Sequence, residues 1–159
     1  RCAYRDPFKG DTREVGACRW TDVASAPCTV ARRYCCKVVK PKSRTAFGKP
    51  LAERQAIQWM LVDNDIDIKQ SLWIVLEAAE KAQRGDPFRK EAAMAKLVAT
   101  EAGGRVVDRC MQMFGGLGVA KDLPLERWFR EMRIRRIGEG PSEVQRHVIA
   151  RELLGSSLR

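Results

Sequence analysis

Helical periodicity with short glycine and proline breaks constrains the fold of this chain more than any other feature of its sequence. From Phe47 onward, apolar residues recur at every third or fourth position. In the first stretch, from about Leu51 to Gln83, they form one stripe: Leu61, Ile68, Leu72, Val75, Ala79 and Ala82. This spacing predicts a helix with one buried face. A glycine stop and a proline follow in Arg84-Gly85-Asp86-Pro87, which predicts a tight antiparallel hairpin.

The same pattern predicts three further helices. The second has its inward residues at Met94, Val98, Ala102, Val106, Cys110 and Met113, and it closes at the glycine cap Phe114-Gly115-Gly116-Leu117-Gly118. The third runs from about Leu123 to Arg133, with Trp128 and Phe129 expected in the core. The last runs from Pro141 to Leu154, with an inward face of Val144, Val148, Ile149 and Leu153. Long helices with short connections predict an all-α bundle.

Residues 1 to 43 have a different composition. They hold ten basic and four acidic residues and five of the six cysteines, in a chain whose formal net charge is +10. This charge favours anionic partners such as nucleic acid, phosphate-bearing cofactors or coenzyme A. The segment shows little periodicity, so we leave 1–43 unassigned, with disorder and an aberrant origin as open alternatives. The helical domain is expected to cover 44–159.

Metal binding and membrane insertion find little support in the sequence. The chain has no CxxC pair and a single histidine, His147, so no metal site is expected. No apolar run is long enough for a membrane span, and no signal-peptide pattern stands at the start. The expectation is a soluble intracellular protein, cytoplasmic if bacterial and mitochondrial or peroxisomal if eukaryotic.

Glu139 stands between Gly138 and Gly140, directly before the last predicted helix. Pro141 suits a first helical turn, where its missing N–H would be unpaired anyway, and the negative charge of Glu143 suits the positive end of the helix dipole. Glu139 is therefore expected on a short, bent connector. On spacing alone, a solvated glutamate at a helix corner is the simpler interpretation, because loops are polar by default.

Two local patterns imitate binding motifs. Asp63-Asn64-Asp65-Ile66-Asp67 resembles the start of a calcium loop, but Ile68 replaces the turn glycine, so we expect a solvated helix face. Gly116-Leu117-Gly118 resembles a dinucleotide turn, but Lys121 replaces the third glycine and a helix precedes the turn.

Two further features are weighed against ordinary surface roles. A basic cluster, which could contact nucleic acid, has no base-reading motif and is expected to be a solvated or phosphate-contacting face: Arg127, Arg130, Arg133, Arg135 and Arg136. His147 follows Glu143 by four residues, and a surface histidine is favoured over an acid/base partner.

Three separated segments fall into one family pattern. They are Arg44-Thr45-Ala46-Phe47-Gly48-Lys49-Pro50-Leu51-Ala52-Glu53, Gln112-Met113-Phe114-Gly115-Gly116-Leu117-Gly118, and Glu139-Gly140-Pro141-Ser142-Glu143-Val144-Gln145-Arg146. In this order and spacing, residues 44 to 154 closely resemble the C-terminal helical domain of the acyl-CoA dehydrogenases. The resemblance implies an up-down four-helix bundle and reverses the preference for a bystander Glu139.

What the resemblance implies is a flavoprotein oxidoreductase of fatty acid metabolism, which oxidises an acyl-CoA to a trans-2-enoyl-CoA and passes electrons to electron transfer flavoprotein. The carboxylate at the Glu139 position removes the α-proton while FAD takes the hydride. An α-proton of a thioester is weakly acidic, so the base needs a water-poor placement and the enolate-like charge needs donors.

The resemblance also assigns cofactor residues by position. Arg44 would contact the FAD phosphates or adenosine, with Phe47 beside it, and Glu143 would lie near the cofactor. Gln112 and the turn Phe114-Gly115-Gly116 would contact the FAD of a neighbouring subunit. That sharing implies a homo-oligomer, a dimer or a tetramer, formed through the bundle.

Departures from the family pattern change what is expected. The residue before Glu139, usually aromatic in short- and medium-chain members, is Gly138, and Pro141 replaces the usual threonine after Gly140. A roomier substrate pocket beside Gly138 and Gly140, suited to bulkier or branched acyl chains, follows as a hypothesis. The family's N-terminal and middle domains have no counterpart in this sequence, and the expectation is a truncated chain that is inactive alone.

Two other functions remain open from the sequence. A non-catalytic helical oligomerisation module derived from this family would assemble without flavin. Nucleic-acid binding by the basic N-terminal arm would be strongly salt-dependent and independent of sequence.

Overall fold

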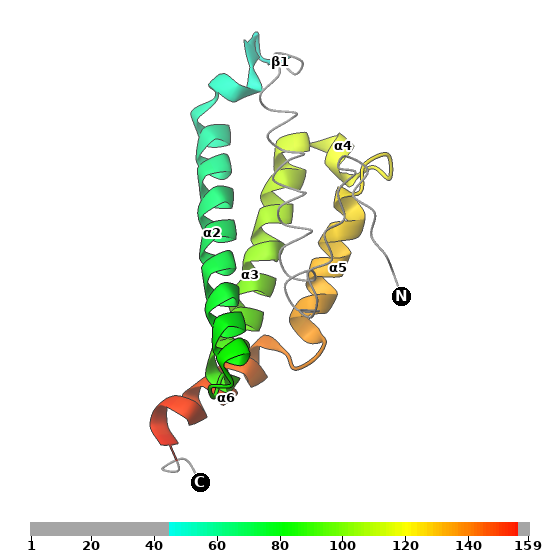
Figure 1. Cartoon of the computed structure of the whole chain (residues 1–159). Coiled ribbons are helices and arrows are strands. Elements are labelled where there is room, and N and C mark those ends of the chain that lie inside the picture. The colour runs from blue at the N-terminus through cyan, green and yellow to red at the C-terminus, as the bar shows by residue number, and fades with distance from the viewer. Residues whose placement is uncertain (1–44, 156–159) are drawn as a thin grey trace, which may run out of the picture.

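The computed structural model describes residues 45–155 as an elongated bundle of helices (Figure 1). A hairpin of two short strands, β1 (Thr45–Ala46) and β2 (Lys49–Pro50), leads through the 3-10 turn η1 (Leu51–Glu53) into the first long helix. The helices are α2 (Gln55–Arg84), α3 (Arg89–Phe114), α4 (Gly116–Val119), α5 (Leu125–Ile137) and α6 (Ser142–Leu154). The predicted all-α, up-down four-helix bundle is confirmed, since α2, α3 and α5 run in alternate directions and α6 closes one end.

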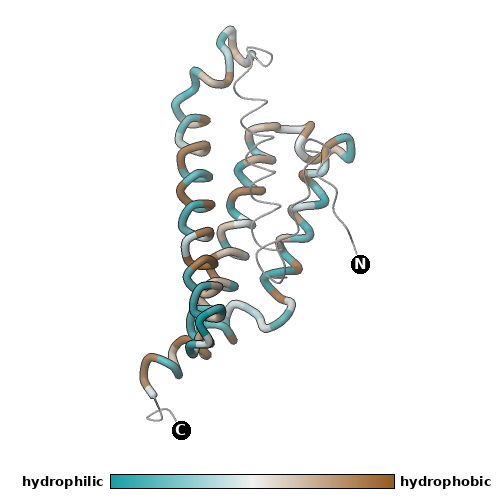
Figure 2. Tube along the Cα trace, in the orientation of Figure 1, coloured by the Kyte–Doolittle hydropathy of each residue, from teal (hydrophilic) through white to brown (hydrophobic). Residues whose placement is uncertain are grey.

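Helices α2 and α3 form the predicted antiparallel hairpin. Gly85 caps α2 in the left-handed conformation at φ 76°, which glycine adopts without steric cost, and its N–H donates to the Ala82 and Lys81 carbonyls. Figure 2 shows hydrophobic and hydrophilic bands alternating along both helices, as expected for helices that bury one side. Small residues of α3, including Ala95 and Ala99, let it approach Val75 and Ala78 of α2 closely.

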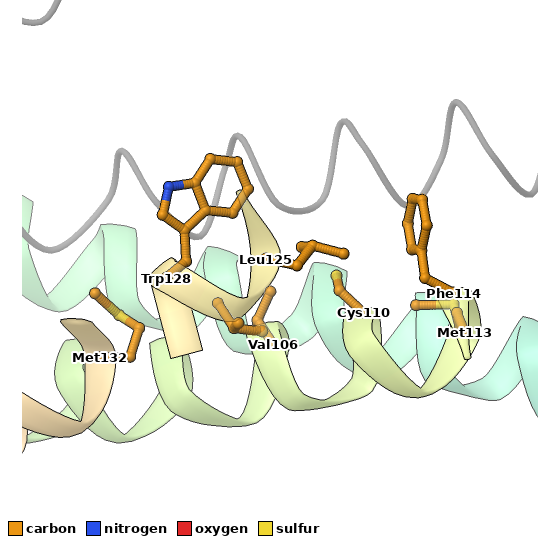
Figure 3. Close-up of a cluster of buried hydrophobic side chains, with 8 residues drawn as sticks. Val106, Cys110, Met113, Phe114, Leu125, Trp128 and Met132 are labelled. Atoms are coloured by element: carbon orange, nitrogen blue, oxygen red, sulfur yellow. The ribbon is translucent and has the colours of Figure 1, made fainter. Parts of the chain in front are cut away.

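The main core lies between α3 and α5. Val106, Cys110, Met113 and Phe114 of α3 meet Leu125, Trp128 and Met132 of α5, as Figure 3 shows. The predicted core position of Trp128 is confirmed. The prediction for Phe129 is wrong, because Leu125, Trp128 and Met132 set the inward face at spacings of three and four, and Phe129 is 43% exposed one step beyond it.

Two predictions about α2 are also wrong, the second only in part. Leu72 is exposed rather than in the buried stripe, and residues 63–67 are a solvated face only in part, since Asp63 and Ile66 are exposed but Asn64 and Asp67 are buried. The stripe follows 64, 67, 71, 75 and 78, so the polar residues lie on the same inward side as Val75 and Ala78. Their polar groups are satisfied by arginines of α3, which is why they can be buried.

The C-terminal helices differ in extent from the prediction. Helix α5 continues to Ile137, and α6 begins at Ser142 with Pro141 as its N-cap. Val144 and Leu153 are exposed rather than inward, because α6 packs against α3 and then extends past the end of the bundle (Figure 1). Within residues 45–155, none of the helices combines the length and apolarity that crossing a bilayer would take.

Candidate active site

The connector between α5 and α6, residues 138–141, carries Glu139 in an unusual backbone conformation. Gly138 ends α5 by donating its N–H to the Ile134 carbonyl at 2.8 Å. Glu139 then has φ 54° and Gly140 has φ 91°. The left-handed region costs a residue with a Cβ about 1–2 kcal/mol, so Glu139 is strained where glycine would not be. Such strain persists only where surrounding contacts hold it.

Two side chains hold the carbonyl groups of this connector. Gln145 of α6 donates through Nε2 to the Glu139 carbonyl at 3.2 Å and to the Gly140 carbonyl at 3.1 Å. Lys96 of α3 donates through Nζ to the Gly140 carbonyl at 2.6 Å. An ammonium donor makes a hydrogen bond about twice as strong as a neutral one. The bend is therefore tied to both neighbouring helices.

A second set of contacts fixes the start of α6. The buried Ser142 donates through Oγ to Glu101 Oε1 at 2.7 Å, and Arg136 Nη2 pairs with Glu101 Oε2 at 2.9 Å. Burial alone would raise the pKa of Glu101, but the Ser142 hydrogen bond and the Arg136 charge outweigh it and hold that pKa below its usual range. Glu101 is therefore a carboxylate that joins α3 to both sides of the connector.

Lys96 is partly buried among acidic residues. Burial lowers its pKa below the usual range, while the negative charges of Glu139, Glu101 and Glu143 act in the opposite direction. The negative charge of Glu139 opposes the effect of burial on the pKa of Lys96, so the two side chains lie close enough for their charges to interact.

A pocket of about 880 Å³ opens beside the connector. Gly138 and Glu139 line it together with Lys96, and most of the remaining wall is apolar: Val75, Ala78, Ala79, Ala82, Phe88, Ala92, Ala95, Ile134 and Val148. Pockets of this size and character suit a small organic ligand with one polar group. Glu139 itself is exposed, so residues 45–155 alone do not give it the water-poor surroundings that proton abstraction needs.

One of the residues assigned to FAD, Glu143, lies in the first turn of α6 beside the connector, whereas the others in the described part of the chain lie at the opposite end of the bundle. Phe47 is 98% exposed on the β1–β2 hairpin, at φ 53°. Arg54 supports it by donating to the Ala46 and Phe47 carbonyls at 2.6 and 3.0 Å, with its guanidinium 5.9 Å from the Phe47 ring centroid. Arg44 lies outside the described residues.

The turn after α3 forms the other part of this end. Gln112 and Gly116 are exposed, and Gly115 has φ 60° with ψ −140°, a conformation suited to glycine. Phe114 differs from the other assigned residues because its side chain is buried in the core. Lys96 and Gln112 stand 16 residues apart on α3, which corresponds to about 24 Å along the helix axis. The β1–β2 hairpin, which carries Phe47, therefore lies at the same end of the bundle as the turn before α4, and the connector between α5 and α6, which carries Glu139, lies at the other end (Figure 1).

Other sequence candidates have ordinary surroundings. His147 is exposed on α6. Several arginines of the basic cluster pair with acidic side chains, among them Arg127 with Glu131 and Arg130 with Glu126. Among the residues that the structure describes, no three His, Cys, Asp or Glu side chains gather as a metal site.

Two polar networks were missed by sequence reasoning. Asp67 accepts from Arg105 at 2.6 Å and from Arg109 at 2.6 Å, and Arg109 also donates to Asn64. Extending the α2 stripe backward from Val75 and Ala78 would have placed Asp67 inside. The second network, from Lys96 and Glu101 to the connector, has no signal in local sequence, because it joins residues more than forty positions apart.

Comparison with known proteins identifies the family. The family model described as "Acyl-CoA dehydrogenase, C-terminal domain" matches residues 19–154 and so begins within the segment left unassigned above. The chain is similar to the mitochondrial short-chain specific acyl-CoA dehydrogenase of Bos taurus, with 44% identity over 121 residues, 76% of this chain and 29% of the bovine enzyme. The chain thus spans less than a third of that relative.

Solved structures agree with the sequence comparison. Butyryl-CoA dehydrogenase from Megasphaera elsdenii aligns with a TM-score of 0.78 and 37% identity, over 82% of this chain and 34% of that one. The FAD complex of PigA aligns with a TM-score of 0.77 and 25% identity, over 82% and 33% of the two chains. The match to the family model and these similarities show that the chain belongs to the acyl-CoA dehydrogenase family and carries its C-terminal domain.

Proposed function

We propose that this chain is the C-terminal portion of an FAD-dependent acyl-CoA dehydrogenase in which Glu139 abstracts the α-proton of the acyl-CoA. The observation that carries the proposal is the place of Glu139: a carboxylate on a strained bend, held by two helices, at the rim of an apolar pocket. A bystander glutamate would not require a left-handed conformation, since glycine would serve better there.

Glu139 would act as a general base. Its carboxylate takes the α-proton, and the electron pair left on the α-carbon forms the new double bond as hydride leaves the β-carbon. FAD, when bound, accepts that hydride, and the resemblance to the family gives electron transfer flavoprotein as the next acceptor. Removing water from the exposed side of Glu139 falls to parts of the enzyme beyond residues 45–155 and to the substrate itself.

The residues of the far end suit contact with FAD. Phe47 is 98% exposed, and the side-chain amide of Gln112 is exposed as well. A Cβ at Gly116 would meet nothing within 4 Å, so the backbone there is open to a ligand. Gly115 lets the chain turn between Gln112 and Gly116. The proposed FAD contacts also include Arg44, and Glu143 at the other end of the bundle, beside the connector. The solved FAD complex of PigA shares this fold.

The separation of the two ends favours an oligomer. Because Glu139 and Gln112 lie at opposite ends, a second copy is a natural source of the turn that contacts a given FAD. The outer face of α2 exposes apolar side chains at spacings of three, four and seven: Trp59, Val62, Ile66 and Trp73. We propose that a second copy of the chain covers this face in a dimer or a tetramer.

The substrate proposal rests on Gly138. The residue lines the pocket without a side chain, so the space that an aromatic residue would fill stays open. Bulkier or branched acyl groups should therefore be accepted.

The test uses the chain joined to the N-terminal and middle domains of the bovine relative, which supply what residues 45–155 lack. The joined enzyme should bind FAD and oxidise acyl-CoA, with branched acyl groups preferred over short straight ones. The full chain alone should remain colourless with added FAD. A joined enzyme that binds FAD, folds and forms no enoyl-CoA would contradict the proposal and favour the alternative, a non-catalytic oligomerisation module.

A further inference from the structure

The backbone at Glu139 is held by more contacts than an ordinary loop requires. Two consecutive residues, Glu139 and Gly140, have positive φ, and only the second is glycine. The carbonyls of both are hydrogen-bonded to side chains of flanking helices. A Cβ at Gly140 would lie 2.7 Å from Gln145 Nε2, so the bend also fits tightly around its own donor.

Helix α3 supplies the contacts that come from outside the α5–α6 pair. Lys96 reaches the Gly140 carbonyl at 2.6 Å, directly after Glu139. About one turn further along α3, Glu101 accepts from Ser142 at 2.7 Å and pairs with Arg136 at 2.9 Å. One helix therefore grips the connector in its middle and at both of its ends, with a cation and an anion that are partly or largely withdrawn from solvent.

Other functions of these two residues fit the structure less well. Within residues 45–155, Lys96 has no carboxylate within ion-pair distance, although three acidic residues influence its pKa, so its strongest contact there is to a backbone carbonyl. Glu101 spends both of its oxygens on Ser142 and Arg136, which leaves little capacity for proton transfer.

We propose that Lys96 and Glu101 are positioning residues, which hold the 138–141 connector in its strained form and so aim the Glu139 carboxylate into the pocket. The proposal rests on the function proposed for Glu139. Lys96 and Glu101, the clamp, act on the Gly140 carbonyl and on Ser142, so the effect of the clamp on backbone order can be measured without catalysis.

The first experiment uses the full chain and measures backbone order by NMR relaxation. In the wild type, the Glu139 and Gly140 amides should have order parameters of about 0.85, which is typical of rigid backbone. Lys96→Met should lower these order parameters below about 0.6. Lys96→Arg, which keeps a cationic donor, should restore most of the order. Lys69→Met is the matched control, at an exposed lysine of α2 that pairs with Asp65. It should leave the order parameters of the Glu139 and Gly140 amides unchanged.

The second experiment measures turnover in the joined enzyme. Lys96→Met should lower kcat at least tenfold and leave the KM for acyl-CoA within twofold, because the base is misplaced while the apolar side chains of the pocket wall remain. Glu101→Gln should act in the same direction, and Lys96→Arg should recover most of kcat. A residue with only a structural role would lower the amount of folded enzyme and leave kcat per bound FAD unchanged.

The outcomes separate this inference from the proposed function. Unchanged order at Glu139 and Gly140 in folded Lys96→Met, or loss of order with unchanged kcat, overturns the positioning role. If Glu139→Gln retains turnover, the base assignment fails, while the NMR result still decides whether the clamp exists.

Discussion

At the scale of single residues, the buried carboxylate of Asp67 contributes to the stability of the folded chain. Asp67 is buried on α2, yet burial, which raises a carboxyl pKa, is outweighed by hydrogen bonds and charge from Arg105 and Arg109, so the pKa of Asp67 lies below its usual range. A carboxylate shared by two guanidinium groups joins α2 to α3.

Replacing Asp67 should therefore cost stability. We expect Asp67→Asn to lower the free energy of unfolding by about 2–3 kcal/mol, because it leaves Arg109 partly buried without its anion. Glu80→Gln, at an exposed glutamate of α2 that pairs with the exposed Arg84, should change it by less than about 1 kcal/mol. Urea unfolding of the full chain measures both, and equal effects would contradict the role given to the network.

The same carboxylate predicts a pH dependence. A folded pKa below the unfolded one gives stability that is present above the unfolded value, near about 3.9, and is lost as pH falls through the folded value. The difference in unfolding free energy between wild type and Asp67→Asn should hence be constant near neutral pH and shrink below about pH 4. A difference that persisted at pH 2 would show that charge is not the cause.

At the scale of elements, the turn after α3 depends on one close backbone approach. A Cβ at Gly118 would lie 2.8 Å from the Met111 carbonyl oxygen and 3.0 Å from Phe114 Cβ, whereas a Cβ at Gly116 would meet nothing within 4 Å. The two glycines of one short motif therefore have different tasks. Gly118 packs α4 onto α3, and Gly116 leaves its surroundings open.

This difference can be measured. Gly118→Ala should destabilise the chain by about 1–3 kcal/mol through overpacking. Gly116→Ala should stay within about 0.5 kcal/mol of the wild type, since neither space nor φ opposes it. Thermal unfolding of both variants in the absence of FAD provides the test, and equal losses would contradict the packing described for Gly118.

Much of the fold at this scale could be predicted from the sequence, and the rest fails for identifiable reasons. Periodicity and the glycine stop at Gly85 predict α2, α3 and their hairpin, because local spacing determines which face is apolar. Phe129 and Val144 were misplaced because hydrophobicity does not tell which apolar residues face a neighbour. The role proposed for Glu139 rests on the family pattern rather than on local spacing, and its positive φ and the bond from Lys96 to the neighbouring Gly140 carbonyl depend on tertiary packing.

At the scale of the whole molecule, the residues proposed for proton abstraction and most of those proposed for FAD contact lie at opposite ends of the bundle. Glu139 lies at one end, and Phe47, Gln112 and the glycine turn lie at the other, with α3 between them (Figure 1). The chain covers 29% of the bovine relative, and under the proposed function other parts of the enzyme would complete the walls around Glu139.

Self-association is the prediction that belongs to this scale. Trp59 and Trp73, at 61% and 69% exposure on α2, should be covered in the oligomer. Trp59→Glu combined with Trp73→Glu should convert an oligomer into a monomer in sedimentation equilibrium, with unchanged helical content. A wild-type chain that stays monomeric at high concentration would contradict the proposed assembly.

The most direct test of the account is anaerobic reduction of FAD by acyl-CoA in the joined enzyme, measured as the loss of flavin absorbance. Glu139→Gln should bind FAD normally and lower the reduction rate by about 10²- to 10⁴-fold, the range lost with a general base. The control Glu131→Gln, at a partly exposed glutamate paired with Arg127 on α5, should reduce FAD at the wild-type rate. Reduction of FAD by Glu139→Gln at the wild-type rate would contradict the assignment of Glu139 as the base.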